Sequence, residues 1–442
     1  MAVDGSLHLE KSDSLVDGLF EPQPRPSEAP RTMPPPPGLL ERVIAGIGIL
    51  VFYHQTPNVW FIQLAPNEII DFSNQIGVAV VLSVCASAFL RGAGRLNLLI
   101  RLIKLEPTVF LFAALALTSF LWSADPNTTM RRGIIFMAVT LFAGYLIIRF
   151  PLSEIIEIFA WTFVASAAVN LFFVLALPTY GIDDEGLWTG VFRQKNGLGY
   201  VAALAVPTLL IAARIHKPQR LIFYSAAALQ LLLLIRSDSK TMLVVGVLAT
   251  LLLPLYNGLR ASRTLKGAVL VTLIASSVFS VAIATANVAV LADWLNKDVT
   301  LTGRLPFWQE LLPIVADRLW LGYGFAAAFG GFFSPVHDAW MYNQWAGDAH
   351  NAYLQILLEL GVVGLMLFII SFARALWRAL PVISTAPGAA PLWPLVILTQ
   401  TMISSVTESG LQSDSMGWTF YLVAVLSVAA QSRMHPTRSP SG

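Results

Sequence analysis

The sequence is poor in residues that cross-link chains or bind soft metals. Cys85 is its single cysteine and lies in an apolar run, so no disulfide and no thiolate metal site can form within the chain. We interpret it as a free cysteine of the hydrophobic core.

Charge is scarce as well. Asp, Glu, Lys and Arg make up 12% of the 442 residues, hydrophobic residues make up 56%, and the mean hydropathy is +0.68. Soluble domains carry about 25% charged residues, so this composition excludes that class. No P-loop, dinucleotide-binding glycine pattern, zinc-protease motif or serine-nucleophile elbow occurs in a suitable context. Nothing in the sequence supports nucleic-acid binding.

Long hydrophobic runs are present instead. They have about the 17–25 residues that a helix needs to cross a bilayer, and they do not alternate in polarity as barrel strands do. The sequence therefore predicts an all-α, polytopic membrane protein of about twelve transmembrane helices. We expect these spans near 39–57, 73–90, 105–122, 133–149, 154–178, 197–213, 220–236, 240–256, 267–290, 351–372, 391–407 and 416–431.

The distribution of basic residues predicts the orientation. With the N-terminus inside, 19 of the 28 Lys and Arg residues fall on the cytoplasmic side, as the positive-inside rule requires. Residues 1–38 contain eight prolines and no apolar signal-peptide core, which is typical of a disordered tail. We expect this cytoplasmic tail, a transmembrane helical bundle over 39–431 with an outer loop at 291–350, and a cytoplasmic tail over 432–442.

The outer loop is too long to be a simple connection. Within it, Leu305, Trp308, Leu312 and Val315 recur at spacings of three and four residues. This pattern predicts a short amphipathic helix that lies on the membrane surface.

A first polar cluster precedes the span at 197–213. Arg193, Lys195 and Asn196 stand next to Gly197 and Gly199 at a helix N-terminus, where free N–H groups and the helix dipole favour phosphate. The cluster is a candidate anion cradle. The alternative is a basic flank followed by a close helix contact at the glycines.

A second cluster comprises Thr302, Gly303 and Arg304, with Trp308 one turn further on. An arginine fork can bind phosphate oxygens through two parallel hydrogen bonds, although an exposed arginine is the simpler alternative. Three further candidates for phosphate or sugar contact lie on the same predicted face. They are Ser239 and Lys240, in a turn that could also be merely solvated, and Glu408 at the end of a span.

A third cluster opens the span at 351–372. His350 stands at the mouth of the predicted helix, where a base with a near-neutral pKa is useful, or is simply a surface histidine. Asn351, Gln355 and Glu359 follow at four-residue spacing and form a polar stripe. A carboxylate at the depth of Glu359 costs about 2.5–3.5 kcal/mol in a bilayer, so it should face the bundle or a wet cavity. Helix–helix hydrogen bonding is the alternative role for the stripe.

An acidic run, 183–185, could in principle hold a hard cation. We do not expect a metal there, because an acidic loop is well solvated without one.

Four motifs together resemble the O-antigen ligase and polymerase superfamily, in particular its ExoQ-type exopolysaccharide polymerases. They are Arg193-Gln-Lys-Asn-Gly-Leu-Gly, Thr302-Gly-Arg with Trp308, Gly322-Tyr-Gly-Phe, and Ala349-His-Asn-Ala-Tyr-Leu-Gln-Ile-Leu-Leu-Glu-Leu-Gly. The resemblance covers about 190–410. The chain departs from many relatives in its Ser237–Thr241 turn, where they carry an arginine after a serine.

The resemblance implies an inverting, metal-independent glycosyltransferase of the bacterial inner membrane, without a cofactor. It acts on the periplasmic face, which makes 291–350 a periplasmic loop, and takes its glycan from undecaprenyl pyrophosphate. Arg193 and Arg304 hold the pyrophosphate, and His350 helps to activate the acceptor hydroxyl. Polysaccharide export or chain-length proteins are expected partners.

Three functions remain open at this point. A polymerase of exopolysaccharide repeat units is favoured over a ligase that transfers a finished chain to lipid A core, and the two differ in acceptor. A lipid-linked oligosaccharide flippase is the third. It needs no long outer loop and should show duplicated halves, which the sequence lacks.

Overall fold

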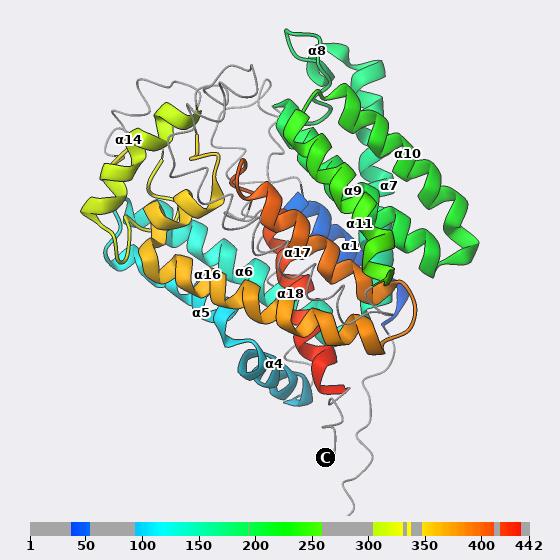
Figure 1. Ribbon diagram of the computed structural model, residues 1–442, viewed down its shortest axis with the longest axis horizontal. Coiled ribbons are helices and arrows are strands. Elements are labelled where there is room, and N and C mark those ends of the chain that lie inside the picture. The colour runs from blue at the N-terminus through cyan, green and yellow to red at the C-terminus, as the bar shows by residue number, and fades with distance from the viewer. Residues whose placement is uncertain are drawn as a thin grey trace, which may run out of the picture. The chain divides into compact units, whose positions relative to one another are not determined.

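The computed structural model describes residues 37–53, 93–192, 194–258, 304–329, 334–336, 347–410 and 416–434. In these ranges the chain is helical, and its only β contact is an isolated bridge between Ile182 and Trp188. The helices are α1 (Leu39–Tyr53), α4 (Ala93–Leu105), α5 (Pro107–Thr118), η2 (Ser119–Leu121), α6 (Pro126–Arg149), α7 (Leu152–Ala176), α8 (Pro178–Gly181), α9 (Lys195–Ile215), η3 (Lys217–Gln219), α10 (Arg220–Arg236), α11 (Lys240–Gly258), α14 (Arg304–Asp317), α16 (Ala352–Thr385), η4 (Ala390–Leu392), α17 (Trp393–Ser404) and α18 (Met416–Met434) (Figure 1).

The all-α prediction is confirmed for the part of the chain that the structure describes. Two expected spans, 73–90 and 267–290, lie outside it, and every other expected span overlaps a helix. Among the described residues, 5 helical segments are long and apolar enough to cross a membrane: Pro126–Arg149, Leu152–Ala176, Lys195–Ile215, Lys217–Arg236 and Ala352–Thr385. The count of twelve spans and the periplasmic loop stay predictions.

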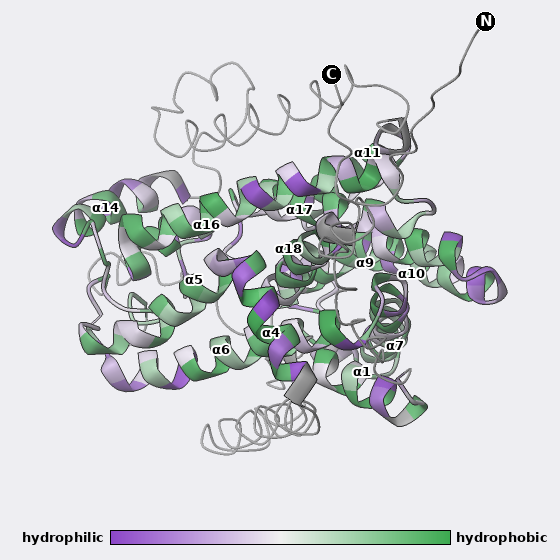
Figure 2. Cartoon of the chain, turned by 90° about the horizontal axis from the view of Figure 1, so that it is seen from below, coloured by the Kyte–Doolittle hydropathy of each residue, from purple (hydrophilic) through white to green (hydrophobic). Residues whose placement is uncertain are grey.

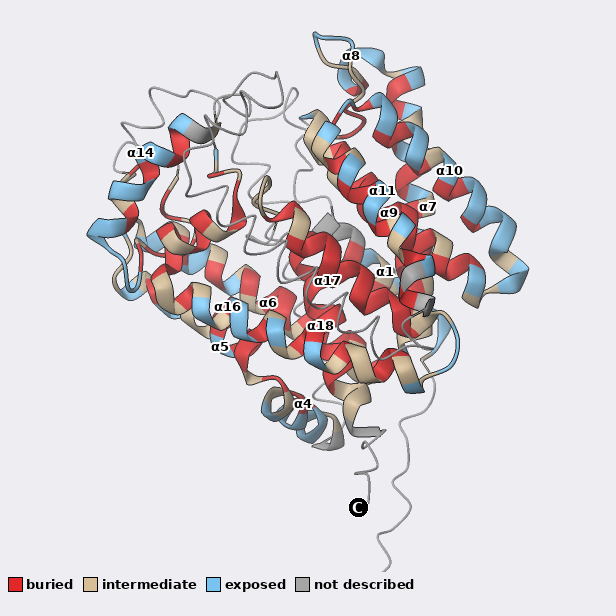
Figure 3. Cartoon of the chain, viewed as in Figure 1, coloured by how far each residue is buried: buried red, intermediate tan, exposed pale blue. Residues whose placement is uncertain are grey.

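α18 lies at the centre of the helical bundle. Its residues from Met416 to Ala429 are buried, coloured red in Figure 3, and it packs on α6, α16 and α17. Trp418 stacks on Phe136 of α6 with ring centroids 4.7 Å apart. α10 is mostly hydrophobic (Figure 2) and, in contrast, exposes large apolar side chains such as Leu221, Leu232 and Ile235, which suits contact with lipid.

α16 is longer than its hydrophobic run predicted. It continues past 372 to Thr385, because Arg374 and Arg378 end the apolar run but not the helix. Both guanidinium groups donate to the fully buried carboxylate of Glu106, which precedes α5, and the Arg374 contact measures 3.3 Å. Charge pairing thus fixes the end of α16 that lies far from the candidate site.

α16 is broken at Gly361, where φ is +63°. The segment 319–324 runs through the break. Its Tyr323 and Gly324 N–H groups donate to the carbonyls of Leu358 and Glu359 at 2.8 and 2.9 Å. In return the Val362 N–H donates to the carbonyl of Leu319 at 2.8 Å. Backbone groups that the break frees are therefore satisfied by a neighbouring segment, as a low-dielectric environment requires.

Candidate functional site

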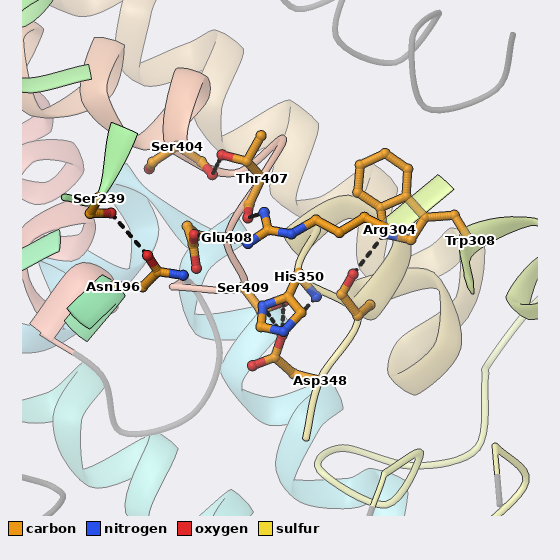
Figure 4. Close-up of polar contacts among 11 residues, drawn as sticks. Asn196, Ser239, Arg304, Trp308, Asp348, His350, Ser404, Thr407, Glu408 and Ser409 are labelled. Carbon is orange, nitrogen blue, oxygen red and sulfur yellow. Dashed lines mark hydrogen bonds and ion pairs between the residues drawn. The ribbon is translucent and has the colours of Figure 1, made fainter. Parts of the chain in front are cut away.

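The candidate site lies where three segments that are distant in the sequence meet. They are the start of α14 with Arg304, residues 348–351 before α16, and residues 407–409 after α17 (Figure 4). Two further polar side chains lie at the edge of this view. Asn196 is at the start of α9, and Ser239 directly precedes α11, which begins at Lys240.

Arg304 is held by the segment after α17. One guanidinium nitrogen donates to the carbonyl oxygen of Thr407, and the other lies 3.4 Å from Oε1 of Glu408. The two charged side chains are only 17% and 15% exposed. Burial raises the pKa of Glu408 to about 7; the positive charge of Arg304 opposes that rise, and the negative charge of Asp348 adds to it. The arginine is therefore a preorganised, partly desolvated cation.

α14 presents this arginine because of its amphipathic sequence. A helix is confirmed here, and its place on the membrane surface stays a prediction. Trp308 and Val315 of the predicted apolar face are buried, but the prediction is wrong for Leu312, which is 41% exposed. The buried face consists of Phe307, Trp308, Leu311 and Val315, which pack against Leu354 and Leu358 of α16. Phe307 and Leu311 complete this stripe at helical spacing, and a strict heptad pattern overlooked them.

His350 is oriented by Asp348. Oδ1 of Asp348 accepts from the backbone N–H of His350 at 2.6 Å and from Oγ of Ser409 at 2.9 Å, and it lies 3.3 Å from Nδ1 of His350. An imidazole that donates from Nδ1 to this carboxylate presents Nε2 as its acceptor. Burial lowers the pKa of His350; the Asp348 charge raises it and Arg304 lowers it further. The histidine is thus held neutral, as a base must be.

The backbone around His350 is held in an uncommon conformation. Its φ is +47°, a value that non-glycine residues adopt only when their surroundings impose it. On its N-terminal side the Ala349 carbonyl accepts from Nε1 of Trp308 at 2.8 Å, and the Ala349 N–H donates to Oε1 of Gln355 at 2.7 Å. Oε1 of Glu359 accepts from Nε2 of Gln355 at 2.7 Å, which fixes the amide orientation.

Three predicted substrate contacts are therefore engaged with protein. Trp308 and Glu359 belong to the network just described and are 2% and 4% exposed. Asn351 is 1% exposed and caps α16, because its Oδ1 accepts from the Leu354 N–H at 3.0 Å. These contacts favour the alternative of internal hydrogen bonding for the polar stripe, and a direct role in substrate binding stays a prediction for all three.

The remaining predicted residues divide into two groups. The structure describes four of them. Oγ of Ser239 donates to Oδ1 of Asn196 at 3.0 Å, so these two are brought together. Lys240 is exposed, and Nζ of Lys195 lies 3.5 Å from Oε2 of Glu185. Arg193 and Thr302 lie outside the described residues. The expected meeting of Arg193 with Arg304 consequently stays a prediction.

Sequence reasoning did not assign roles to Asp348 and Ser409. The two-residue spacing of Asp348 and His350 was a usable signal, because an Asp side chain often accepts from the backbone N–H two residues on. Ser409 offered no local signal, since its contact with Asp348 spans 61 residues of sequence.

The acidic run at 183–185 forms a turn. Oδ1 of Asp183 accepts from the N–H groups of Glu185 and Leu187 at 3.0 and 2.8 Å. Across the part of the chain that the structure describes, His, Cys, Asp and Glu side chains nowhere gather in threes as a metal-binding group.

Comparison with known proteins confirms the predicted resemblance. A family model described as O-Antigen ligase matches residues 223–369, which include Arg304 and His350. The chain is also 28% identical over 291 residues to "Exopolysaccharide production protein ExoQ" of Rhizobium meliloti (strain 1021). That match covers 62% of this chain and 65% of the relative's length. Together with the apolar helices, these similarities indicate an integral membrane protein.

Proposed function

We propose that the protein is a glycosyltransferase of the bacterial inner membrane that polymerises exopolysaccharide repeat units at the periplasmic face. The donor is a glycan on undecaprenyl pyrophosphate, and the acceptor is a sugar hydroxyl. The observation that carries the proposal is the convergence of a partly buried arginine at the start of α14 and an Asp-oriented histidine just before α16.

In the proposed reaction the acceptor oxygen attacks the anomeric carbon and the carbon–oxygen bond to the diphosphate breaks. The hydroxyl proton passes to Nε2 of His350, and undecaprenyl pyrophosphate departs with the bonding electrons. A single displacement of this kind inverts the anomeric centre. Arg304 stabilises the charge that develops on the leaving group, so the step needs no metal, and Arg193 is proposed to add a second cation.

The other site residues are proposed to support these two. Trp308, Gln355 and Glu359 hold the backbone of Ala349, just before His350, and Asn351 caps the helix that follows it. Asn196 and Ser239 are hydrogen-bonded to each other (Figure 4) and are proposed to contact the sugar next to the diphosphate. Lys195, Lys240 and Thr302 are proposed to attract or contact the same group.

A ligase is retained as the second candidate, because the matching family model is described as O-Antigen ligase. Ligase and polymerase share the chemistry above and differ only in acceptor. Product size separates them: a ladder of increasing length indicates a polymerase, whereas a single modified lipid A core indicates a ligase. Export or chain-length proteins are proposed partners of the polymerase.

The first test is release of undecaprenyl pyrophosphate by purified protein that is supplied with lipid-linked repeat units in EDTA. Arg304→Ala and His350→Ala are each expected to lower the rate by at least about 10²-fold, the usual loss when a charge-stabilising or proton-accepting group is removed. Arg304→Lys should recover only part of the rate, because lysine lacks the bidentate fork.

Two matched variants control for general damage. Arg318 follows α14, where its guanidinium lies 4.9 Å from the centre of the Tyr323 ring. His216 lies at the far end of α9, with its ring 3.8 Å from Glu157. Arg318→Ala and His216→Ala should therefore retain most activity. Full activity of Arg304→Ala and His350→Ala in folded protein would remove the proposed site.

A further inference from the structure

The guanidinium group proposed to bind the diphosphate is already paired with an anion. Arg304 contacts the Thr407 carbonyl and the carboxylate of Glu408, and both charged side chains are largely shielded from water. A diphosphate that approaches this arginine must therefore meet Glu408.

Three groups from three elements interact with the Glu408 carboxylate. They are Arg304 of α14, Asp348 before α16, and the phenol of Tyr200 on α9, and His350 lies in the same cluster beside Asp348. A Cβ atom at Gly410 would lie 2.7 Å from the Tyr200 hydroxyl, which shows how closely α9 packs on this segment. With His350 neutral, the cluster holds two carboxylates and a single guanidinium among the described groups. A diphosphate adds negative charge to a cluster that already has an excess of it.

Of the two carboxylates, Glu408 is the one that an incoming diphosphate can displace from its contact. Asp348 is fixed by the His350 N–H and the Ser409 hydroxyl, at 2.6 and 2.9 Å. Among the residues that the structure describes, the Glu408 side chain instead has one long contact, 3.4 Å, to the arginine itself. Loss of that contact leaves a charged carboxylate in a poorly hydrated place, and protonation removes this penalty.

We propose that Glu408 is a proton-coupled counter-ion of Arg304. It neutralises the arginine in the empty site, and it takes up one proton when the diphosphate of the donor displaces it. This inference rests on the proposed function and adds to it a regulation of donor binding by pH.

The direction of the pH dependence follows from linkage. In the protein without donor, burial raises the pKa of Glu408 to about 7. A neighbouring diphosphate raises that pKa further. Below pH 7 the side chain is protonated in both states, so donor affinity is independent of pH. Above pH 7 binding requires proton uptake, so the dissociation constant rises by up to about tenfold per pH unit until the pKa of the complex is reached.

The test measures binding of an undecaprenyl-diphosphate-linked oligosaccharide by calorimetry between pH 6 and 9. The diphosphate of this donor is a diester and does not itself ionise in that range. A His350→Ala background prevents turnover and removes the imidazole titration. Measurements in two buffers of different ionisation enthalpy give the number of protons taken up.

The parent should bind with a flat dissociation constant to about pH 7 and a rising one above it, with about one proton taken up per donor at pH 8. Glu408→Gln should give a flat profile without proton uptake and should bind more tightly than the parent at pH 8. Glu310→Gln, an exposed position on α14, should behave as the parent does.

A parent that binds the donor with a flat pH profile and no proton uptake overturns this inference alone, and that measurement needs no substitution at 408. Persistence of the slope in Glu408→Gln overturns it too. If the donor does not bind at any pH, and the wild-type protein also releases no undecaprenyl pyrophosphate, the proposed function is removed as well.

Discussion

At the scale of single residues, the site depends on one carboxylate that serves three donors. Asp348 accepts from the backbone of His350 and from Ser409, and it lies beside the imidazole. It thereby fixes the ring orientation and supports the uncommon backbone conformation at φ +47°. In the proposed mechanism its role is to position His350 as the base, while the imidazole itself meets the acceptor.

Asp348→Asn is expected to lower kcat by about 10²-fold, because the imidazole loses its orientation and its charge partner. Asp348 raises the pKa of His350, so its removal lowers that pKa. Since activity requires neutral His350, the acidic limb of the pH–rate profile should move to lower pH. The measurement is kcat against pH.

Ser409→Ala is the graded control, because it removes one donor to Asp348 and leaves the charge in place. It should lower kcat less and leave the acidic limb unmoved. A purely structural role for Asp348 would leave the limb of Asp348→Asn where the wild type has it.

The sequence pointed to Arg304 and His350 because polar residues are rare and costly in an apolar chain. It could not reveal what each one touches. The partners of Arg304 are 103 and 104 residues away, and no local pattern encodes such a contact. The roles of Trp308, Asn351 and Glu359 were harder to predict, since a buried hydrogen bond and a substrate contact call for the same residue types.

At the scale of elements, the break in α16 connects the helix to the segment 319–324. A Cβ atom at Gly361 would lie 2.3 Å from the carbonyl carbon and oxygen of Trp320. Only glycine permits this approach. The break lies two residues beyond Glu359, so it also sets the position of the network that holds His350.

Gly361→Ala is expected to destabilise the protein and to lower kcat, because the added methyl group forces segment 319–324 away from the helix. At φ +63° and ψ −165° the backbone lies in a region that essentially only glycine adopts, which costs an alanine about 1–3 kcal/mol, and the clash adds to that. Thermal unfolding in detergent and activity at a permissive temperature are the measurements.

Gly388→Ala separates strain from clash. Gly388 has φ +85°, but an added Cβ atom there would have nothing within 4 Å. The variant should lose a little stability and keep its activity. Equal losses in the two variants would contradict a specific role for the close approach at Gly361.

Helix positions followed from hydrophobic runs, and every expected span within the described ranges overlaps a helix. The helix α4 was not predicted, because it lies between two expected spans, and two features of α16 did not follow either. The hydrophobic run gave the apolar length of α16 and not its end, since Arg374 and Arg378 end the run while the helix continues and both pair with the buried Glu106. The break at Gly361 was also missed, because its cause is the backbone of another segment.

At the scale of the whole molecule, the helical bundle brings the start of α14, the start of α16 and the end of α17 to one place. Each segment alone is an ordinary helix terminus. Together they bring a guanidinium, an imidazole and a carboxylate into one cluster, and the proposed transfer from a diphosphate uses the first as its cation and the second as its base. The meeting of these three termini depends on helix packing between distant segments, and no single sequence motif predicts it.

The most direct measurement is photolabelling with an undecaprenyl diphosphate analogue that carries a diazirine next to the diphosphate. Labelled peptides are predicted to contain Arg304, residues 348–351 and residues 407–410, and Arg304→Ala should abolish this labelling. Labelling confined to the exposed apolar surface of α10, or labelling that Arg304→Ala leaves unchanged, would contradict a donor site at these segments.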